Sequence, residues 1–269
     1  MKIILNKNKL IKYTSTEKNL GFVPTMGALH PGHISLIKKC NDYCNKTVVS
    51  IFINKPQFNN KGDFQNYPRI LKKDIYLLKK LKVDYLYLPT HKQIYPNGPN
   101  KKIKLNKFSK MLCGKFRPGH FESVIDVIDR FIKIIKPGKI FFGNKDMQQL
   151  VLVKNFVRNN HNKTKVIGCK TIREKNGIPY SSRNFLLTTK QKRTASIITK
   201  LLLKKKQKLI KNKDYFILLK KKIYELGVHK IDYIKILDIN KIFQPFKKRK
   251  KYKIFIAYYL NKVRLIDNI

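Results

Sequence analysis

Two histidines three residues apart, His30 and His33, are the first candidates in this sequence for a ligand-binding or reactive site. They lie in the segment PTMGALHPGHISL (24–36), where glycines and prolines crowd between a short apolar run and a run with helical periodicity. Because glycine and proline are costly inside regular structure, the segment predicts a turn that joins a strand to a helix. Unpaired backbone N–H groups at such a helix N-terminus can face an anion. A zinc site would need a third ligand, which the sequence does not signal.

The residues around this turn alternate between strand-like and helix-like patterns. Apolar runs predict a first strand within residues 1–13 and further strands at 21–23, 47–53, 83–88, 139–142 and 166–169. Apolar residues at helical spacing predict helices at 33–42, 70–81, 120–135 and 146–158. This alternation predicts an α/β fold with a Rossmann-like open parallel sheet. Ligands bind such sheets at the carboxyl ends of the strands, where the histidine turn and the segment FINKPQF (52–58) both fall.

The pattern changes after about residue 171. Two lysine-rich amphipathic helices, at 189–211 and 215–226, precede strands at 231–237 and 253–259, with the basic turn PFKKRKKYK between these strands. We therefore expect two domains: residues 1–170 with the parallel sheet, and residues 171–269 as a smaller C-terminal α+β domain.

The composition limits the classes of function. The formal net charge of +46 comes mainly from lysine, because only nine of the 61 basic residues are arginine. Nucleic-acid-binding proteins usually rely on arginine, and many of these lysines lie on polar faces of expected helices, so a solvated lysine coat is favoured over specific nucleic-acid binding. No apolar run approaches the ~18 residues of a membrane span, and no secretory signal is evident, which favours a cytoplasmic protein. The cysteines at 40, 44, 113 and 169 are expected to be buried free thiols.

The histidine turn, placed after a strand and opening a helix, resembles the loop with which the nucleotidyltransferase superfamily holds ATP for adenylyl transfer. Further stretches narrow the resemblance: VVSIFINKPQF (48–58), YPR (67–69), RPGHF (117–121), FFGNKDMQQL (141–150) and IREKNGIPYSSRN (172–184). Together with RLIDN (264–268), and in this order, they make the chain similar to the pantothenate synthetase family over essentially its whole length.

Members of that family condense pantoate with β-alanine. ATP first adenylates the pantoate carboxylate and releases pyrophosphate, and the amine of β-alanine then displaces AMP. The resemblance implies the same reaction here, with ATP, pantoate and β-alanine as substrates, Mg²⁺ as a cofactor and a homodimer as the assembly. It also implies that residues 1–170 bind the nucleotide and pantoate, and that residues 171–269 form a lid that carries the SSRN loop.

The resemblance also assigns roles to individual residues. His30, His33 and Lys145 are expected to be catalytic: the histidines would donate hydrogen bonds to the α-phosphoryl oxygens, with His33 as the proton donor, and Lys145 would add positive charge. Gln57 and Gln149 would bind pantoate, Asn54 would support the same pocket, and Gln57 would also touch β-alanine. The residues expected at ATP are Met26, Gly27, Ala28, Leu29, His30, Pro31, Gly32, His33, Gly143, Asn144, Lys145, Asp146, Ile172, Tyr180, Ser181, Ser182 and Arg183. No residue is assigned to the metal.

Each motif alone also has a plain structural interpretation. Gln148 and Gln149 could be exposed helix residues, the SSRN segment a helix N-cap, and Asp146 the N-cap of the helix that follows. Asp74 is expected to be a surface charge rather than a metal contact. The occurrence of all the motifs in family order favours the functional interpretation.

The sequence departs from the family pattern at several positions. Pro56 stands one position later than the proline of the usual Asn-Pro-x-Gln, Asn144 replaces a glutamate, and Ser123 replaces a glycine. None of these changes removes a group assigned to the chemistry, but they alter its surroundings. An active enzyme that is slower or less stable is the expectation.

Three other functions stay open from the sequence. An adenylyltransferase would leave the nucleotide on its product, although the C-terminal domain, Gln57 and the distant SSRN segment argue against it. A nucleic-acid-binding protein would hold polyanions near physiological salt, whereas a lysine coat would lose affinity steeply as the salt concentration rises. A decayed enzyme would fold without turning over.

Overall fold

The computed structural model describes residues 1–211, 215–243, 248 and 250–269. The chain divides into two compact units: residues 1–144 and 148–170 form unit 1, and residues 145–147 and 171–269 form unit 2. Four residues of the basic turn expected at 245–253, namely 245–247 and 249, lie outside the described residues. Within the described ranges, no helix is long and apolar enough to cross a membrane.

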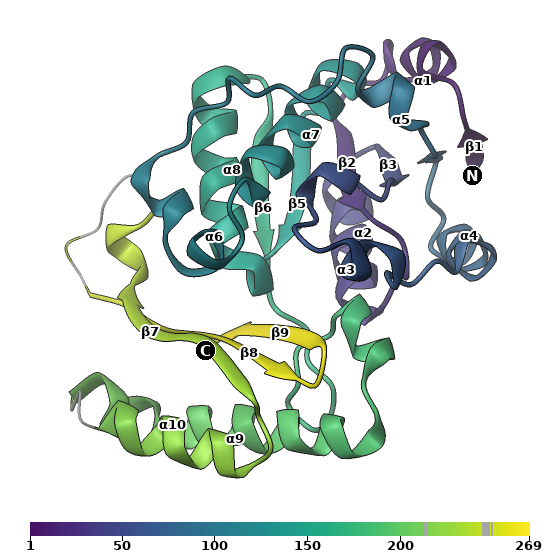
Figure 1. The fold of residues 1–269 in the computed structure, drawn as a ribbon. Helices are drawn as coiled ribbons and strands as arrows, with labels where there is room; N and C mark the ends of the chain where they lie inside the picture. The colour runs from purple at the N-terminus through teal and green to yellow at the C-terminus, as the bar shows by residue number, and fades with distance from the viewer. Residues whose placement is uncertain (212–214, 244–247, 249) are drawn as a thin grey trace. The chain divides into compact units, whose positions relative to one another are not determined.

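Unit 1 is built on a six-stranded parallel sheet (Figure 1). Its strands are β1 (Lys2–Ile4), β2 (Leu20–Thr25), β3 (Lys46–Ile51), β4 (Tyr85–Tyr87), β5 (Lys139–Gly143) and β6 (Lys165–Cys169). Its helices are α1 (Lys7–Thr14), α2 (Pro31–Tyr43), α3 (Lys61–Gln65), α4 (Leu71–Lys80), α5 (His91–Ile94), α6 (Leu112–Phe116), α7 (His120–Ile135) and α8 (Met147–Asn160). The predicted α/β fold with an open parallel sheet is therefore confirmed.

The strand order β1-β4-β3-β2-β5-β6 reverses direction at one point. From β2 the chain moves outward through β3 to β4, and from β5 it moves outward in the opposite direction to β6. Such a reversal leaves a crevice outside the carboxyl ends of the two central strands. The turns that follow β2 and β5 are therefore brought side by side by the topology alone.

The two faces of the sheet are covered by different helices. Successive residues of a strand point to opposite faces, and in β2 Val23 packs in a cluster with residues of α2 and α4. Its neighbour Phe22 instead contacts Phe131 of α7, with ring centroids 5.4 Å apart. Phe131 also packs edge-on against Tyr87 of β4. Burial of each such large apolar side chain contributes about 1.5–3 kcal/mol.

Helix α7 has the bounds that the sequence predicts, and its ends show why. It is preceded by Gly119 in the left-handed region, at φ 75°, and followed by Lys136, also left-handed, at φ 52°. Pro137 comes next and cannot continue a helix, because it has no backbone N–H. Helix α2 begins at Pro31, two residues earlier than predicted, because proline suits the first turn and His30 caps the helix.

The first residues of the chain differ from the prediction of a single strand. β1 covers only Lys2–Ile4, and α1 (Lys7–Thr14) follows at once. The side chain of Asn6 accepts hydrogen bonds from the backbone N–H groups of Asn8 and Lys9. This N-cap ends the strand and starts the helix.

Unit 2 is an α+β arrangement, as predicted. Helices α9 (Thr189–Lys211) and α10 (Tyr215–Glu225) precede an antiparallel sheet of β7 (Lys230–Asp238), β8 (Tyr252–Leu260) and β9 (Val263–Asn268), in the order β7-β8-β9. Strand β9 was not predicted. It pairs with β8 from Val263 opposite Leu260 to Asn268 opposite Phe255. Both helices and all three strands contribute to one apolar core.

The four cysteines are all free and buried, as predicted. Cys40 and Cys44 lie beneath Gly21 of β2, where a Cβ atom would clash with the Sγ of Cys40. Burial raises the pKa of the Cys40 thiol to about 12 and also raises the pKa of the Cys44 and Cys169 thiols. The thiolate is the nucleophile, so these side chains are inert in the folded protein at neutral pH.

We therefore expect the native protein at pH 8 to react slowly with a thiol-disulfide reagent. At this pH the three shifted groups stay protonated, because their pKa values lie above that of an ordinary thiol. After denaturation all four thiols should react at the rate of free cysteine. Rapid stoichiometric modification of Cys40 in the folded protein would contradict this packing.

Candidate functional site

The turn between β2 and α2 carries both histidines, and their rings stack. The ring centroids of His30 and His33 are 4.0 Å apart at an interplanar angle of 28°. The backbone N–H of Gly32 donates to Nδ1 of His30 over 3.1 Å. Because Nδ1 accepts this bond, the proton of a neutral His30 ring is on Nε2, which can donate. Both rings are half-buried, so they remain within reach of a ligand.

Four backbone N–H groups of this turn are bonded within the protein. The N–H of Gly27 donates to Oγ1 of Thr25 over 3.2 Å, and the N–H of Gly32 is taken by His30. The N–H groups of Ala28 and Leu29 are also bonded within the protein, to Asp74. These four N–H groups are therefore already used within the protein, and the side chains of the turn are the further groups that can contact an anion.

Asp74, expected at the surface, is buried at 2% exposure. Its Oδ2 accepts from Ala28 N over 2.9 Å, and its Oδ1 accepts from Leu29 N over 2.8 Å. Burial raises the pKa of its carboxyl, and the two N–H donors oppose that rise. Asp74 is thus an internal anion for the turn.

A chain of buried amides leads from Tyr95, just after α5, to the segment after β3. The hydroxyl of Tyr95 donates to Oδ1 of Asn54 over 2.8 Å, and Nδ2 of Asn54 donates to Oε1 of Gln57 over 3.1 Å. Nε2 of Gln57 in turn lies 3.0 Å from Sδ of Met26 in the histidine turn. Asn54 is 1% exposed, so it orients Gln57 from below, and the half-buried Gln57 is the amide open to a ligand. Burial raises the pKa of Tyr95, which keeps its hydroxyl protonated and able to donate.

The RPGHF motif holds the main chain of this same segment. Nδ1 of His120 lies 2.8 Å from the carbonyl oxygen of Gln57, and Nη2 of Arg117 donates to that oxygen over 3.0 Å. Oγ of Ser123 donates to the carbonyl oxygen of Pro56 over 3.0 Å. Two departures from the family pattern, Pro56 and Ser123, are therefore in direct contact. The motif was visible in the sequence, but this positioning role was not.

The turn after β5 carries the next expected residues. Gly143 ends the strand, and Asn144, which is half-buried, follows it in the crevice position set by the strand order. Gln148 in α8 is buried rather than exposed, because its amide bonds to the backbone of Phe108, Met111 and Cys113. Gln149 is half-buried, so of the two glutamines it is the one that keeps access to a ligand.

Lys145 belongs to unit 2 and is held through its main chain. Nδ2 of Asn268, which is 2% exposed in β9, donates to the carbonyl oxygen of Lys145 over 2.7 Å. Nζ of Lys145 lies 3.4 Å from Oδ1 of Asp146. Asp146 directly precedes α8, in the position of an N-cap. The RLIDN motif therefore fixes the backbone of a residue that the sequence assigns to the phosphates.

The segment from Ile172 to Asn184 is an ordered loop of unit 2. The N–H of Tyr180 donates to the carbonyl oxygen of Ile172 over 3.0 Å, which closes a hairpin-like turn. Arg173 anchors it through two bonds to the carboxylate of Asp267, at 2.7 and 2.9 Å. Ser181 caps the 3₁₀ turn Ser182–Leu186, so the structural interpretation of this serine as an N-cap holds. Ser182 is buried and Arg183 is half-buried.

The structure thus distributes the expected residues over the two units. Unit 1 brings together the turn after β2, with Met26 to His33, and the segment after β3, with Asn54 and Gln57. Ala28 and Leu29 are buried, at 0% and 5% exposure, and Pro31 is exposed at the start of α2. Unit 2 carries Lys145, Asp146, Ile172 and the residues from Tyr180 to Arg183. Among the described residues, no three His, Cys, Asp or Glu side chains gather to hold a metal ion.

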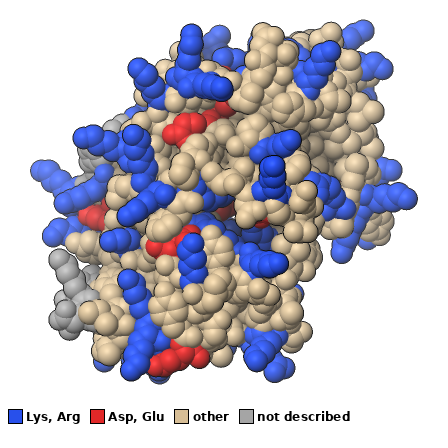
Figure 2. All heavy atoms as spheres, in the orientation of Figure 1, with Lys and Arg blue, Asp and Glu red and all other residues tan. Residues whose placement is uncertain are grey.

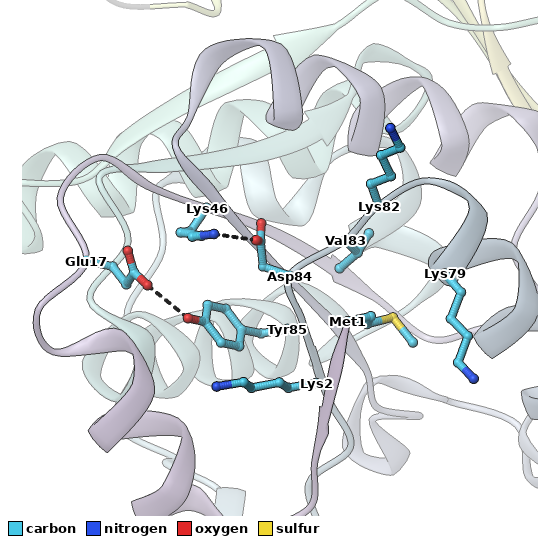
Figure 3. Close-up of a pocket in the computed structure, with 9 residues that line it drawn as sticks. All are labelled: Met1, Lys2, Glu17, Lys46, Lys79, Lys82, Val83, Asp84 and Tyr85. Carbon is cyan, nitrogen blue, oxygen red and sulfur yellow. Dashed lines mark hydrogen bonds and ion pairs between the residues drawn. The ribbon is translucent and has the colours of Figure 1, made fainter.

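A hollow of about 580 Å³ lies at the amino ends of β1, β3 and β4, the ends of the strands opposite to the histidine turn (Figure 3). Lysines line it, but Lys46 is paired with Asp84 at 2.9 Å, and the hydroxyl of Tyr85 donates to Glu17. Figure 3 shows the side chains of Lys79 and Lys82 pointing away from each other. Asp84 and Glu17, the carboxylates of this lining, are therefore both bonded within it.

An open parallel sheet with a histidine turn at its switch point defines an α/β protein of the nucleotide-binding type. The family described as pantoate–β-alanine ligase matches residues 2–269, and the chain belongs to that family. The pantothenate synthetase of Francisella tularensis subsp. novicida is 41% identical, over 97% of this chain and 92% of the relative.

Two solved structures are also similar. The pantoate–β-alanine ligase of Francisella tularensis, "Complexed with Beta-gamma ATP and Beta-alanine", has a TM-score of 0.86 and 38% identity and covers 100% of this chain and 97% of its own. The pantothenate synthetase of Thermus thermophilus has a TM-score of 0.89 and 28% identity and covers 100% of this chain and 99% of its own.

The amide chain predicts that Tyr95→Phe destabilises the protein by about 2 kcal/mol, because Oδ1 of buried Asn54 loses its donor. Tyr87→Phe is the matched control: it also removes a buried hydroxyl, but its acceptor Gln93 is only half-buried and can bind water instead. The measurement is urea unfolding of both variants. If Tyr95→Phe lowers the free energy of unfolding less than Tyr87→Phe does, the hydrogen bond from Tyr95 to Asn54 does not have the role described here.

Proposed function

We propose that this chain condenses pantoate with β-alanine in an ATP-dependent reaction that proceeds through pantoyl adenylate and releases AMP and pyrophosphate. The observation that carries the proposal is the contact between the histidine turn and Gln57, through Met26, in a chain that belongs to the pantoate–β-alanine ligase family. A relative with this fold is named in complex with "Beta-gamma ATP and Beta-alanine", which supports ATP and β-alanine as substrates here.

Adenylation requires donors aimed at the α-phosphoryl group, where negative charge accumulates. Nε2–H of His30 can donate here, because Gly32 fixes Nδ1 as the acceptor. His33, stacked on the same ring, is the second donor and the proton donor in this scheme. The N–H groups of Ala28 and Leu29 are bonded to Asp74 and do not bind phosphate in this scheme. The histidine side chains therefore supply hydrogen bonds to the α-phosphoryl group that backbone N–H groups supply in a phosphate-binding loop.

Pantoate must be held by groups that orient its carboxylate without neutralising it, since the carboxylate is the nucleophile. The uncharged amide of Gln57 meets this demand, and its orientation is fixed by Asn54. Gln149 is the second pantoate ligand, and Gln57 also contacts β-alanine in the second step. Asn54 acts through Gln57, because it is buried and both its amide hydrogens are used.

The residues of unit 2 complete the proposal for ATP. Lys145 supplies a compact positive charge for the phosphates, and Ser181, Ser182 and Arg183 supply hydroxyls and a guanidinium for the triphosphate. The ordered hairpin from Ile172 to Tyr180 presents this loop. On this proposal residues 171–269 act as the lid of a nucleotide- and pantoate-binding domain at residues 1–170.

Mg²⁺, the homodimer and a cytoplasmic location belong to the same proposal. The described residues offer no cluster of three acidic or histidine ligands, and Mg²⁺ commonly binds through substrate phosphates with one or two carboxylates. We therefore propose that the ion arrives with ATP, where it shields the triphosphate from the incoming carboxylate.

The large positive charge does not favour a nucleic-acid-binding function. Figure 2 shows Lys and Arg side chains scattered over the visible face, with other residues between them. A distributed lysine coat of this kind gives weak, salt-sensitive adhesion to polyanions. The catalytic proposal accounts for the positions of the motifs, which the charge does not.

The direct test is an AMP-release assay on purified protein from which nucleic acid has been removed. AMP should appear only when ATP, pantoate and β-alanine are all present with Mg²⁺. Pantoate-dependent exchange of pyrophosphate into ATP should occur without β-alanine, because adenylation precedes the attack of the amine. Absence of both activities would refute the proposed function.

His33→Ala should lower the rate of pantoate-dependent pyrophosphate exchange by about 10²–10³-fold, because a donor to the developing charge is lost. His161→Ala is the control. This histidine pairs with Asp129 over 2.7 Å and precedes the amino end of β6, whereas the histidine turn follows the carboxyl end of β2. The control should retain its exchange rate within about twofold. An exchange rate near wild type in His33→Ala would remove His33 from the chemistry.

Gln57→Glu should raise the KM for pantoate about tenfold or more and leave the KM for ATP within about twofold. The substitution keeps the size and the acceptor oxygen of the side chain but sets a carboxylate against the substrate carboxylate. Gln207→Glu makes the same chemical change at an exposed position of α9. If the KM for pantoate is the same in Gln57→Glu and Gln207→Glu, Gln57 does not contact pantoate.

A further inference from the structure

The carboxylate of Asp74 is the structural centre of the histidine turn. It reaches the turn from the first turn of α4, a helix more than 40 residues later in the chain. Both of its oxygens are used, one on Ala28 N and the other on Leu29 N, and the side chain is 2% exposed. Neither oxygen is placed at the surface where a substrate could bind.

The turn needs such a partner because its backbone is strained. Gly27 and Ala28 both have positive φ, at 80° and 50°, and a non-glycine residue such as Ala28 rarely adopts this conformation. Successive N–H groups in a turn of this kind point the same way and form a concavity that binds an anion. In this chain the carboxylate of Asp74 occupies the concavity. Gly27 is required beside it, because a Cβ atom there would meet Oδ2 of Asp74 at 3.1 Å.

The hydrogen bonds of Asp74 also affect the positions of His30 and His33, which come after Leu29 in the chain. Leu29, bonded through its N–H to Asp74, is the neighbour of His30, and His30 caps α2 and stacks on His33. A turn without its internal anion can relax Ala28 to negative φ, which redirects the chain at the N-terminus of α2. Catalytic groups displaced by about 1 Å can lose about 10²-fold in rate.

We propose that Asp74 is a positioning residue that holds the β2–α2 turn, and through it the two imidazoles, in the geometry that carboxylate adenylation requires. This role rests on the proposed function, because it concerns the same step. It differs from a general contribution to stability, since it predicts a defect confined to adenylation.

The test compares Asp74→Asn with Asp84→Asn. The carboxylate of Asp84 also accepts two hydrogen bonds, one from the backbone N–H of Thr47 over 2.9 Å and one from Lys46. Asp84 lies at the amino ends of the strands, away from the histidine turn (Figure 3). In Asp74→Asn an amide NH₂ must face one of the two N–H donors. The rate of pantoate-dependent pyrophosphate exchange at saturating substrates should fall about tenfold to hundredfold, with the KM for β-alanine unchanged. Asp84→Asn should lose stability but keep its exchange rate.

Amide hydrogen exchange supplies a readout that a general loss of stability does not move. In Asp74→Asn the amides of Ala28 and Leu29 should exchange at least about tenfold faster, while amides of β2 and β5 keep their wild-type rates relative to global unfolding. If Asp74→Asn yields no folded protein, Asp74→Ser removes the unfavourable amide and takes its place in both measurements.

If the Asp74 variant exchanges pyrophosphate at the same rate as the Asp84 variant, the positioning role is overturned while the proposed function stays intact. Unchanged protection of Ala28 and Leu29 would overturn it as well. If wild-type protein and Asp84→Asn both fail to exchange pyrophosphate, the proposed function falls and the role of Asp74 in adenylation falls with it.

Discussion

The two hydrogen bonds between the buried carboxylate of Asp74 and the N–H groups of Ala28 and Leu29 are the constraint on which the site depends. They let the chain leave β2, pass through two residues of positive φ, and enter α2 with His30 as its cap. An isolated turn of this shape would be unfavourable, and its concavity of N–H groups would be open to any anion. Because the carboxylate of Asp74 occupies this concavity, the half-buried side chains of Met26, His30 and His33 are the groups of the turn that we expect to meet a ligand.

The rest of unit 1 extends this principle, in which polar groups of the site are fixed by other buried polar groups. Tyr95 orients Asn54, Asn54 orients Gln57, and Gln57 reaches Met26 of the histidine turn. Arg117 and His120 both bond to the main-chain carbonyl oxygen of Gln57. A substrate carboxylate that must attack phosphorus gains from such preorganisation, because the entropy of orienting the reacting groups is lost on folding rather than during the reaction.

Much of the fold could be predicted because its signals are local. The central strands are buried runs of Val, Ile and Phe, and α7 has an apolar stripe with a glycine before it and a proline after it. Strand β9 escaped prediction because Arg264 and Asp267 interrupt its short apolar pattern, and both find ion-pair partners in the fold. Helix α1 escaped because its start depends on one cap, Asn6.

For the site, the sequence indicates candidate residues, which remain predictions, but not the hydrogen bonds that hold them in place. Motif order predicts roles for the histidines, Gln57 and Lys145, yet the sequence placed Asp74 at the surface, where it does not lie, and left the RPGHF motif without a role. In both cases the partners are main-chain atoms far away in the sequence: N–H groups for Asp74, and the carbonyls of Pro56 and Gln57 for the motif. Side-chain patterns carry no signal for bonds to a distant backbone, so only the folded chain shows them.

The most direct measurement of the central claim is a crystal structure of the protein with a non-hydrolysable ATP analogue and pantoate. We expect Nε2 of His30 and a ring nitrogen of His33 to lie within hydrogen-bond distance of the α-phosphate. Gln57 should contact pantoate, and Asp74 should stay bonded to Ala28 and Leu29. A nucleotide bound away from both histidines, or an α-phosphate held by the N–H groups of Ala28 and Leu29 with Asp74 displaced, would contradict it.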